Sequence, residues 1–461
     1  MRHTSANLLS EAPKIAALTR RRKHLTGTSL PEVRQIAVVG DEPEALLLAV
    51  LFSEARVSIY LAGPFEGSDN RVFSNTWDEA QWLLNLHRRN GRIVQVGDPE
   101  ELPLARIPNI IVTGHANSQL GMSSLERAVR TVAKNLQKDS SLTFAGLCRP
   151  GYTLGTIGGM VEKYSGLSID GEIGLCYLPL LWNGEDFQAF REKPVILAAA
   201  TEKVASHAHG LFLQVFPAIT STPKISTAEA AGLFTPLYRE VVGALELELA
   251  GFCQNERVDY AEASTLCKTL GSQAWGAPRT SPARDSVAST IAASAIGARG
   301  SRLIKVAKRV NEHAPSQVLE LIKSALALCG RRIRHTKIAF LGLNGLQSVS
   351  SIKRSPPQIL HTLRRRGASI SLFLRETSTR SLGEYPDSIS VETSLRRTVQ
   401  SASCAVVALD RLSGTELDPQ LLASEMTRPG AVCDISRVLE ASNVERAGLF
   451  YTSIGRGHTE A

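Results

Sequence analysis

A glycine turn follows the first apolar segment of the chain, and it is the first place where the sequence could hold a ligand. Residues 35–45 read QIAVVGDEPEA. A strand followed by G-x-G-x-x-G binds the diphosphate of a dinucleotide, because the second glycine lets the backbone approach the phosphates. Here Gly40 is kept, Glu42 stands at the second glycine position and Ala45 stands at the third. The fingerprint is therefore degenerate.

The same turn is acidic, which opposes phosphate binding. Asp41, Glu42 and Glu44 place three carboxylates at the start of the predicted helix. They suit the positive end of the helix dipole, but they repel a phosphate. Pro43 removes a backbone donor, and Leu61 replaces the acidic residue that would hold the ribose hydroxyls at the end of the second strand. We therefore expect no ordinary binding of NAD.

Four further side chains could carry chemistry. His115 follows a predicted strand and could act as a base, although a surface histidine is the simpler interpretation. Cys148 has an arginine neighbour that could lower its thiol pKa, but a buried thiol is the simpler interpretation. His207 and His209 lie two residues apart and would face different sides of a helix. They make a poor metal pair, and no metal site is predicted.

Short apolar runs alternate with amphipathic segments in the first and last thirds of the chain. This alternation is typical of βαβ units, in which buried parallel strands are separated by helices. Strands are predicted over 35–40, 57–61, 107–112, 142–147, 172–178 and 195–199, and again over 337–342, 369–374, 405–409, 432–435 and 449–451. The prediction is an α/β protein with two Rossmann-like domains joined by a long central helix and a helical middle domain.

The predicted central helix covers residues 226–256. Ser226 and Glu229 have the spacing of a capping box at its start. Pro236 lies inside it and predicts a kink near Thr235. An apolar stripe recurs at helical spacing, at Val241, Leu245, Leu249 and Phe252. If the stripe packs against a symmetry mate, the chain forms a homodimer; alternatively, the stripe faces the domains of its own chain.

Composition excludes several classes of protein. The chain has 461 residues, 43% of them hydrophobic and 21% charged, as in a soluble protein of two or three domains. No apolar run has the roughly 18–20 residues that span a bilayer, so no membrane partner is predicted. The seven cysteines form no C-x-x-C pair, which suggests reduced thiols in the cytoplasm.

The charge of the chain points to no nucleic acid. The net charge is +8, but its excess is scattered, and no basic stripe interleaved with aromatic residues is visible. Nucleic-acid binding is therefore disfavoured. Phosphate-bearing small molecules or an acidic partner would suit the charge equally well. Residues 1–34 are predicted to be a solvated basic tail.

Several motifs give the chain a family resemblance. Residues 341–356 read LGLNGLQSVSSIKRSP, which falls without gaps on LGLxFKxxTDDxRxSP of the UDP-glucose/GDP-mannose dehydrogenase family. Residues 448–457 are similar to the family's GFxYxGIGR. Ala228-Glu229 resembles the AE that opens its central helix, and residues 177–179 resemble its YxPE segment. The resemblance covers residues 35–457.

The resemblance implies a division of the chain and a reaction. It implies a Rossmann-like domain over 35–215 with a degenerate NAD site, a helical dimerisation domain over 216–330, and a Rossmann-like domain over 331–461 that would bind a UDP-sugar. Members of this family oxidise the C6 alcohol of a nucleotide sugar to a carboxylate with two NAD molecules. A cysteine captures the intermediate aldehyde as a thiohemiacetal.

The positions that the family uses for catalysis hold other residues here. The glutamate after YxP corresponds to Leu180, and the lysine and asparagine of AExxKxxxN correspond to Gly232 and Pro236. The nucleophilic cysteine corresponds to Ser281, which is more simply a loop residue or a helix cap, while Asp285 keeps a carboxylate. None of these replacements can supply the original chemistry, except for Asp285.

The last domain keeps its structural residues and loses its polar ones. Gly342 and the Ser355-Pro356 pair remain where the fold needs them. Lys353 takes the position of the family's arginine, and Arg456 belongs to the final motif. The resemblance makes these two residues candidates for substrate binding.

Three functions remain open at this stage. The first is a catalytically inactive relative that serves as a scaffold or regulatory subunit in polysaccharide or glycan precursor metabolism, with an active dehydrogenase as one partner. The second is a module that binds a nucleotide sugar without oxidising it. Neither of these first two functions needs a cofactor. The third is an active NAD-dependent dehydrogenase that forms a uronate.

Overall fold

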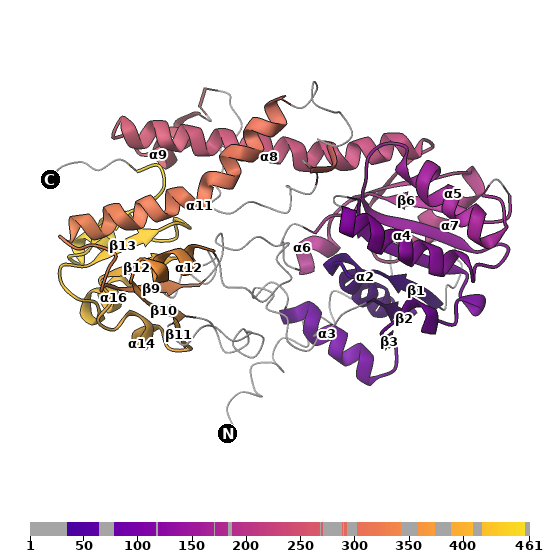
Figure 1. Ribbon diagram of the computed structural model, residues 1–461, viewed down its shortest axis with the longest axis horizontal. Helices are drawn as coiled ribbons and strands as arrows, with labels where there is room; N and C mark the ends of the chain where they lie inside the picture. Colours follow the sequence, from indigo (N-terminus) through magenta and orange to yellow (C-terminus); the bar gives the residue numbers. More distant parts are fainter. Residues whose placement is uncertain are drawn as a thin grey trace.

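The computed structural model describes most of the chain. The residues described are 35–63, 78–116, 119–169, 171–182, 187–267, 269–270, 288, 290–292, 302–342, 358–373, 389–408 and 417–456. Two sheets lie at opposite ends of one long helix (Figure 1). Among the described helices, none is long and apolar enough to cross a membrane.

The first sheet has the strand order β3-β2-β1-β4-β5-β6-β7-β8. All neighbouring pairs are parallel except β6 and β7. The strands are β1 (Gln35–Val39), β2 (Ser58–Ala62), β3 (Ile93–Val96), β4 (Asn109–His115), β5 (Ser141–Leu147), β6 (Gly174–Leu178), β7 (Val195–Ala199) and β8 (Ile219–Thr222). The strand order reverses direction between β1 and β4, which is where such sheets bind ligands.

Helices cover both faces of the first sheet, which is why its inner strands are continuous apolar runs. One face packs against α2 (Pro43–Glu54), α3 (Asp78–Arg89), α6 (Phe187–Arg191) and α7 (Glu202–Phe212). The other face packs against α4 (Gln119–Ala133), the π-helix Thr153–Gly158 and α5 (Gly159–Ser165). Pro43 is the first residue of α2, a position at which the missing N–H costs nothing.

The second sheet is parallel throughout, in the order β11-β10-β9-β12-β13-β14. Its strands are β9 (Lys337–Leu341), β10 (Ser369–Phe373), β11 (Ile389–Glu392), β12 (Cys404–Val407), β13 (Ala431–Asp434) and β14 (Phe450–Thr452). Its short helices are α12 (Gln358–Arg365), α14 (Leu395–Val399), α16 (Pro419–Glu425) and α17 (Ala441–Arg446). The prediction of two Rossmann-like domains is confirmed.

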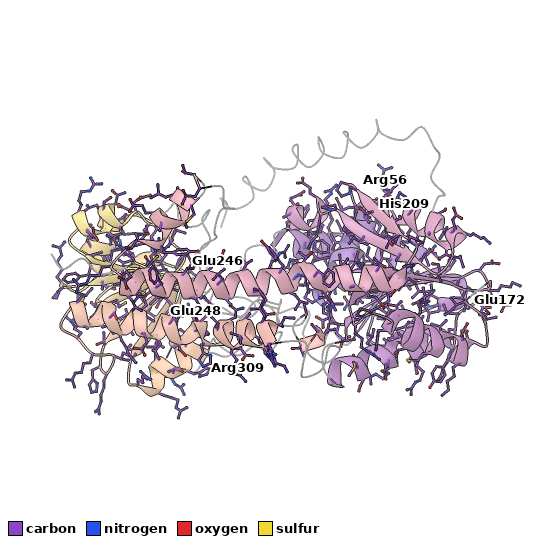
Figure 2. All side chains as sticks on the ribbon, turned by 90° about the horizontal axis from the view of Figure 1, so that it is seen from above. Arg56, Glu172, His209, Glu246, Glu248 and Arg309 are labelled. Carbon is purple, nitrogen blue, oxygen red and sulfur yellow. The ribbon has the colours of Figure 1, made fainter. Side chains whose placement is uncertain are left out.

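The long helix α8 (Ile225–Asn255) joins the two sheets. It runs along α11 (Arg302–Leu328) (Figure 2), and the Asn311 side chain donates a hydrogen bond to the Glu240 carbonyl at 2.9 Å. The short helix α9 (Tyr260–Cys267) follows it. The helix continues through Pro236, and the kink near Thr235 stays a prediction.

The predicted capping box is wrong. Ser226 lies inside α8, and the helix is preceded by Lys224, which makes no side-chain cap. Glu229 does not reach back to the start of its own helix, because its carboxylate accepts hydrogen bonds from the backbone of Gly151 and Thr153. The spacing fits a local cap, but a tertiary contact takes the glutamate.

Candidate functional site

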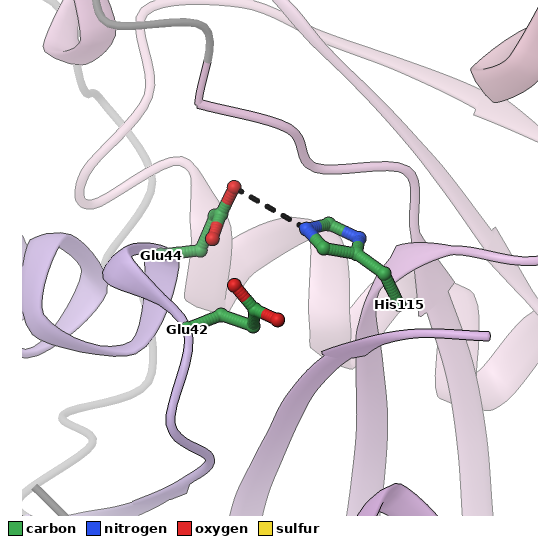
Figure 3. A group of neighbouring side chains, drawn as sticks. All are labelled: Glu42, Glu44 and His115. Carbon is green, nitrogen blue, oxygen red and sulfur yellow. Dashed lines mark ion pairs between the residues drawn. The ribbon is translucent and has the colours of Figure 1, made fainter. Parts of the chain in front are cut away.

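The candidate site lies at the carboxyl ends of β1 and β4, where the strand order reverses. The turn after β1 carries Glu42 and Glu44, and β4 ends at His115. Figure 3 shows these three side chains facing one another. In a dinucleotide-binding sheet this crevice receives the diphosphate, at the start of the helix that follows the first strand.

Glu44 is turned into the protein at this point. Only 1% of its surface is exposed, and its Oε1 accepts a hydrogen bond from the backbone N–H of Trp182 at 2.7 Å. The same oxygen lies 3.5 Å from Nε2 of His115. A single carboxylate thus connects the turn after β1 with the segment after β6 and the end of β4.

His115 is buried, with 3% of its surface exposed, so the prediction of a surface histidine is wrong. The reason is that β4 continues to residue 115, which pairs in register with Leu147 of β5. The Leu147 N–H donates to Nδ1 of the imidazole at 3.1 Å. The neutral ring must therefore carry its hydrogen on Nε2, the atom that faces Glu44. The lone pair of Nδ1 already accepts the hydrogen bond from Leu147, so His115 is poorly suited to act as a general base.

Glu42, Glu44 and His115 lie close enough together to be weighed against a metal centre. One ligand atom each from Glu42, Glu44 and His115 lies within 4.8 Å of the others. A metal-bound imidazole uses one nitrogen for the metal and donates from the other. Here the second nitrogen, Nδ1, faces the Leu147 N–H and cannot donate to it. The ring is oriented as a donor toward carboxylates, which does not fit a metal centre.

The other residues of the predicted dinucleotide turn have structural positions. A Cβ on Gly40 would lie 2.1 Å from Oγ1 of Thr113, so packing against β4 requires this glycine. Ala45 and Leu61 are fully buried in the hydrophobic core. Leu61 therefore points away from any ligand at the edge of the sheet. The residues present do not fit NAD.

Among the predicted catalytic positions that the structure describes, Gly232 lies against the segment that follows β6. Leu180 is buried in the core of the first sheet. A Cβ on Gly232 would lie 2.6 Å from Cβ of Pro179 and 3.4 Å from the Tyr177 hydroxyl. The space that a lysine stem would need is therefore filled. Pro236, one turn further along α8, is also buried.

Three predicted site residues cannot be placed. Ser281, Asp285 and Lys353 lie outside the described residues.

The sequence did not reveal the role of Glu229. It is fully buried at the start of α8, where its carboxylate accepts from the N–H groups of Gly151 and Thr153, the latter at 2.7 Å. The Cys148 thiol donates to the same carboxylate at 3.4 Å. Burial, with the nearby Glu229 charge, raises the pKa of the Cys148 thiol well above its usual value. The interpretation of Cys148 as a buried thiol is confirmed, and the cluster attaches α8 to the turn after β5.

Arg456 has partners within the protein. Its guanidinium donates to Glu445 at 2.9 Å and lies 5.1 Å from the centre of the Tyr451 ring. Its backbone pairs with Asp259 in an antiparallel bridge. These contacts attach the end of the second sheet to the α8–α9 turn. A role of Arg456 in substrate binding stays a prediction.

The two histidines of α7 have separate partners. Nε2 of His207 lies 2.8 Å from the Asn109 amide oxygen, at the start of β4. Nδ1 of His209 lies 3.0 Å from the Ser221 hydroxyl on β8. Each imidazole attaches α7 to a different strand.

Comparison with known proteins gives one curated relative and many similar folds. No protein-family model matches the chain. UDP-N-acetyl-D-mannosamine dehydrogenase of Pyrococcus horikoshii is 23% identical over 344 residues, which cover 73% of this chain and 77% of that protein.

Solved structures show the same fold. The UDP-D-ManNAc dehydrogenase from Pyrococcus horikoshii aligns with a TM-score of 0.73 at 21% identity, over 92% of this chain and 99% of its own. The UDP-glucose dehydrogenase from Pyrobaculum islandicum aligns with a TM-score of 0.70 at 14% identity, over 94% of this chain and 100% of its own. Both likenesses extend over both sheets and the helix between them.

Proposed function

We propose that this chain, which by its fold and its curated relative belongs with the nucleotide-sugar dehydrogenases, is a member of that family that does not oxidise a sugar. It would serve as a scaffold or regulatory subunit, or hold a nucleotide sugar, in polysaccharide or glycan precursor metabolism. An active dehydrogenase of the same pathway is the partner we expect, in the cytoplasm.

The position of Glu44 is the observation that carries this proposal. At the N-terminus of α2, where a coenzyme diphosphate would accept hydrogen bonds, the chain supplies its own buried carboxylate. A diphosphate brought to this place would meet the carboxylates of Glu42, which is half-buried, and of Glu44, which is 1% exposed, and the like charges would repel. The filled space beside Gly232 supports the same conclusion for the catalytic lysine.

An active dehydrogenase remains the second candidate, because the relatives that the chain resembles are named as dehydrogenases. Such an enzyme would use NAD to oxidise the C6 alcohol of a UDP- or GDP-sugar. It would have to bind the coenzyme elsewhere than at the turn Gly40–Ala45.

Ligand titration separates these functions. Thermal unfolding of the full chain is measured with NAD, with UDP-glucose and with GDP-mannose, together with NADH formation at 340 nm. A non-oxidising member shows no NAD-dependent shift and no NADH. A shift with the nucleotide sugars alone selects the binding module, and a shift with none selects the scaffold. Saturable NAD binding at micromolar concentration, or NADH formation, contradicts the proposal.

A homodimer through α8 is part of the proposal. The predicted stripe divides, because Leu249 packs against the core of the second sheet while Leu245 and Phe252 stay exposed. Tyr238, Leu245 and Phe252 lie seven residues apart, with exposed fractions of 62%, 43% and 61%. Apolar side chains at this spacing form the seam of packed helix pairs.

A further inference from the structure

One internal segment of the chain has only basic charged residues, so the excess charge is less scattered than the sequence analysis expected. From Leu321 to Arg375 the sequence has eleven Lys and Arg residues and no Asp or Glu. The rest of the chain therefore has 41 of the 52 basic residues and all 44 acidic residues, a slight negative excess. These 55 residues carry a charge of +11, and the basic tail over residues 1–34 adds seven basic residues against two acidic ones.

The fold brings basic residues of this segment together at the amino ends of β9 and β10, in the second sheet. The turn before β9 carries Arg331, Arg332 and Arg334. Arg365 ends α12, and Arg366 begins the turn between α12 and β10. We call these five residues the basic edge. The two turns touch, because the His335 N–H donates to the Gly367 carbonyl at 2.8 Å and a Cβ on Gly367 would lie 3.1 Å from the Arg334 side chain.

The basic edge is open to solvent. Arg332, Arg334, Arg365 and Arg366 are exposed and Arg331 is half-buried. None of the ion pairs that the structure gives for the described residues joins a carboxylate to these five guanidinium groups. Two more exposed arginines precede the neighbouring strands: Arg397 lies on α14, before β12, and Arg428 lies on the turn before β13.

Helix dipoles explain only part of this charge. Arg365 ends α12, where a cation offsets the negative end of the helix. Arg332 and Arg334 lie beyond the end of α11 at Leu328 and outside any helix. Like charges gathered in this way repel one another and destabilise the folded state. A partner that brings negative charge would remove this cost.

We propose that the basic edge is a docking surface for an acidic segment of a partner protein. Arginine binds carboxylates with two parallel hydrogen bonds, and it is enriched over lysine at protein interfaces. Leu328, with an exposed fraction of 39%, ends α11 three residues before Arg331 and provides an apolar contact of the kind that such an interface uses.

Single-stranded nucleic acid fits this surface less well. Its bases stack on successive aromatic side chains. Among the large hydrophobic side chains described as exposed, Phe450 is the aromatic residue at the amino ends of these strands. It lies on β14, three strands away from β9, so it offers no series of aromatic rings beside the basic edge. The basic edge also lies at the amino ends of the strands. It is therefore separate from the carboxyl ends, where a sugar nucleotide would bind, and the proposal holds whether or not the chain oxidises a sugar.

The test measures binding of a short fluorescein-labelled polyglutamate peptide to the full chain by anisotropy, over a series of salt concentrations. The first variant combines Arg332→Glu, Arg365→Glu and Arg366→Glu. Its control combines Arg89→Glu, Arg106→Glu and Arg127→Glu, three exposed arginines of the first domain, which change the net charge equally. We expect the first variant to lose about tenfold or more in affinity and the control to change by less than about twofold.

Other outcomes would overturn the proposal. An equal loss in both triple variants would mean that only net charge matters. Absence of peptide binding at low salt would remove the docking surface altogether. Tighter binding of a duplex DNA of equal charge would assign the edge to nucleic acid instead. Circular dichroism and a second triple variant with glutamine at the same three positions separate lost binding from lost folding.

Discussion

At the scale of single residues, a second buried carboxylate–histidine contact gives the chain a measurable pH dependence. Nε2 of His87 lies 2.6 Å from Oε1 of Glu54, between α3 and α2, and His87 is 2% exposed. The hydrogen bond from His87 lowers the pKa of Glu54 below its ordinary value of 4.5, although burial acts in the opposite direction. Unlike His115, this imidazole faces its carboxylate at full hydrogen-bond distance.

The sign of the effect follows from linkage. A carboxyl group with a lowered pKa in the folded state adds stability above its unfolded pKa and loses it as the pH falls. We therefore expect Glu54→Gln to destabilise the chain at pH 7, and the difference from the parent protein to shrink below pH 4.5. Urea unfolding at several pH values measures it. Glu256→Gln, at an exposed position, is the control. A difference that stays constant down to pH 3 would contradict this assignment.

At the scale of elements, two glycines of α8 allow the effect of side-chain packing on stability to be measured apart from the effect of helix propensity. A Cβ on Gly232 would collide with Pro179, whereas a Cβ on Gly251 meets nothing within 4 Å. We expect Gly232→Ala to destabilise the chain by about 2 kcal/mol, because overpacking forces neighbours to move. Gly251→Ala should stabilise it by about 0.5–1 kcal/mol.

Thermal and urea unfolding of both variants check this prediction. Gly232→Lys, which restores the residue type of the family, should destabilise more and restore no oxidation. Stabilisation by Gly232→Ala would show that the space beside Pro179 is open after all, and the argument against a lysine there would fail.

Most elements could be predicted from the sequence, because buried parallel strands are unbroken apolar runs. The exceptions have physical reasons. Strand β3 (Ile93–Val96) was missed because it lies at the sheet edge and its side chains are mostly not buried. Helix α11 begins at Arg302 and contains Pro315, a residue type that more often stands in the first turn of a helix.

The candidate site could be predicted only in part. The acidic turn Gly40–Ala45 already indicated that a diphosphate is excluded. The sequence could not show that Glu44 turns inward to the Trp182 N–H, because that contact joins residues 138 positions apart. Glu229 was misassigned for the same reason, since local spacing gives no information about a tertiary partner.

At the scale of the whole molecule, the exposed face of α8 predicts association. Phe234 extends the seam of Tyr238, Leu245 and Phe252, and its exposed fraction is 68%. We expect the chain to be a dimer by light scattering. The double variant Leu245→Glu with Phe252→Glu should be a monomer, because two buried charges per subunit would cost several kcal/mol.

The control for the dimer is chosen from outside α8. Leu154→Glu with Leu213→Glu alters two exposed apolar side chains of the first domain and should leave the dimer intact. A monomeric parent chain at micromolar concentration, or a control that dissociates as readily, would contradict an interface on α8.

The inward position of Glu44 has a consequence for the history of this chain. Its carboxylate is the acceptor for the Trp182 N–H, so removing it alone takes from this buried N–H the acceptor that it uses. A return to coenzyme binding would need a glycine in the turn, a new acceptor for Trp182 and space at residue 115 at once. These changes are needed together, so no single substitution in the turn would restore a coenzyme site.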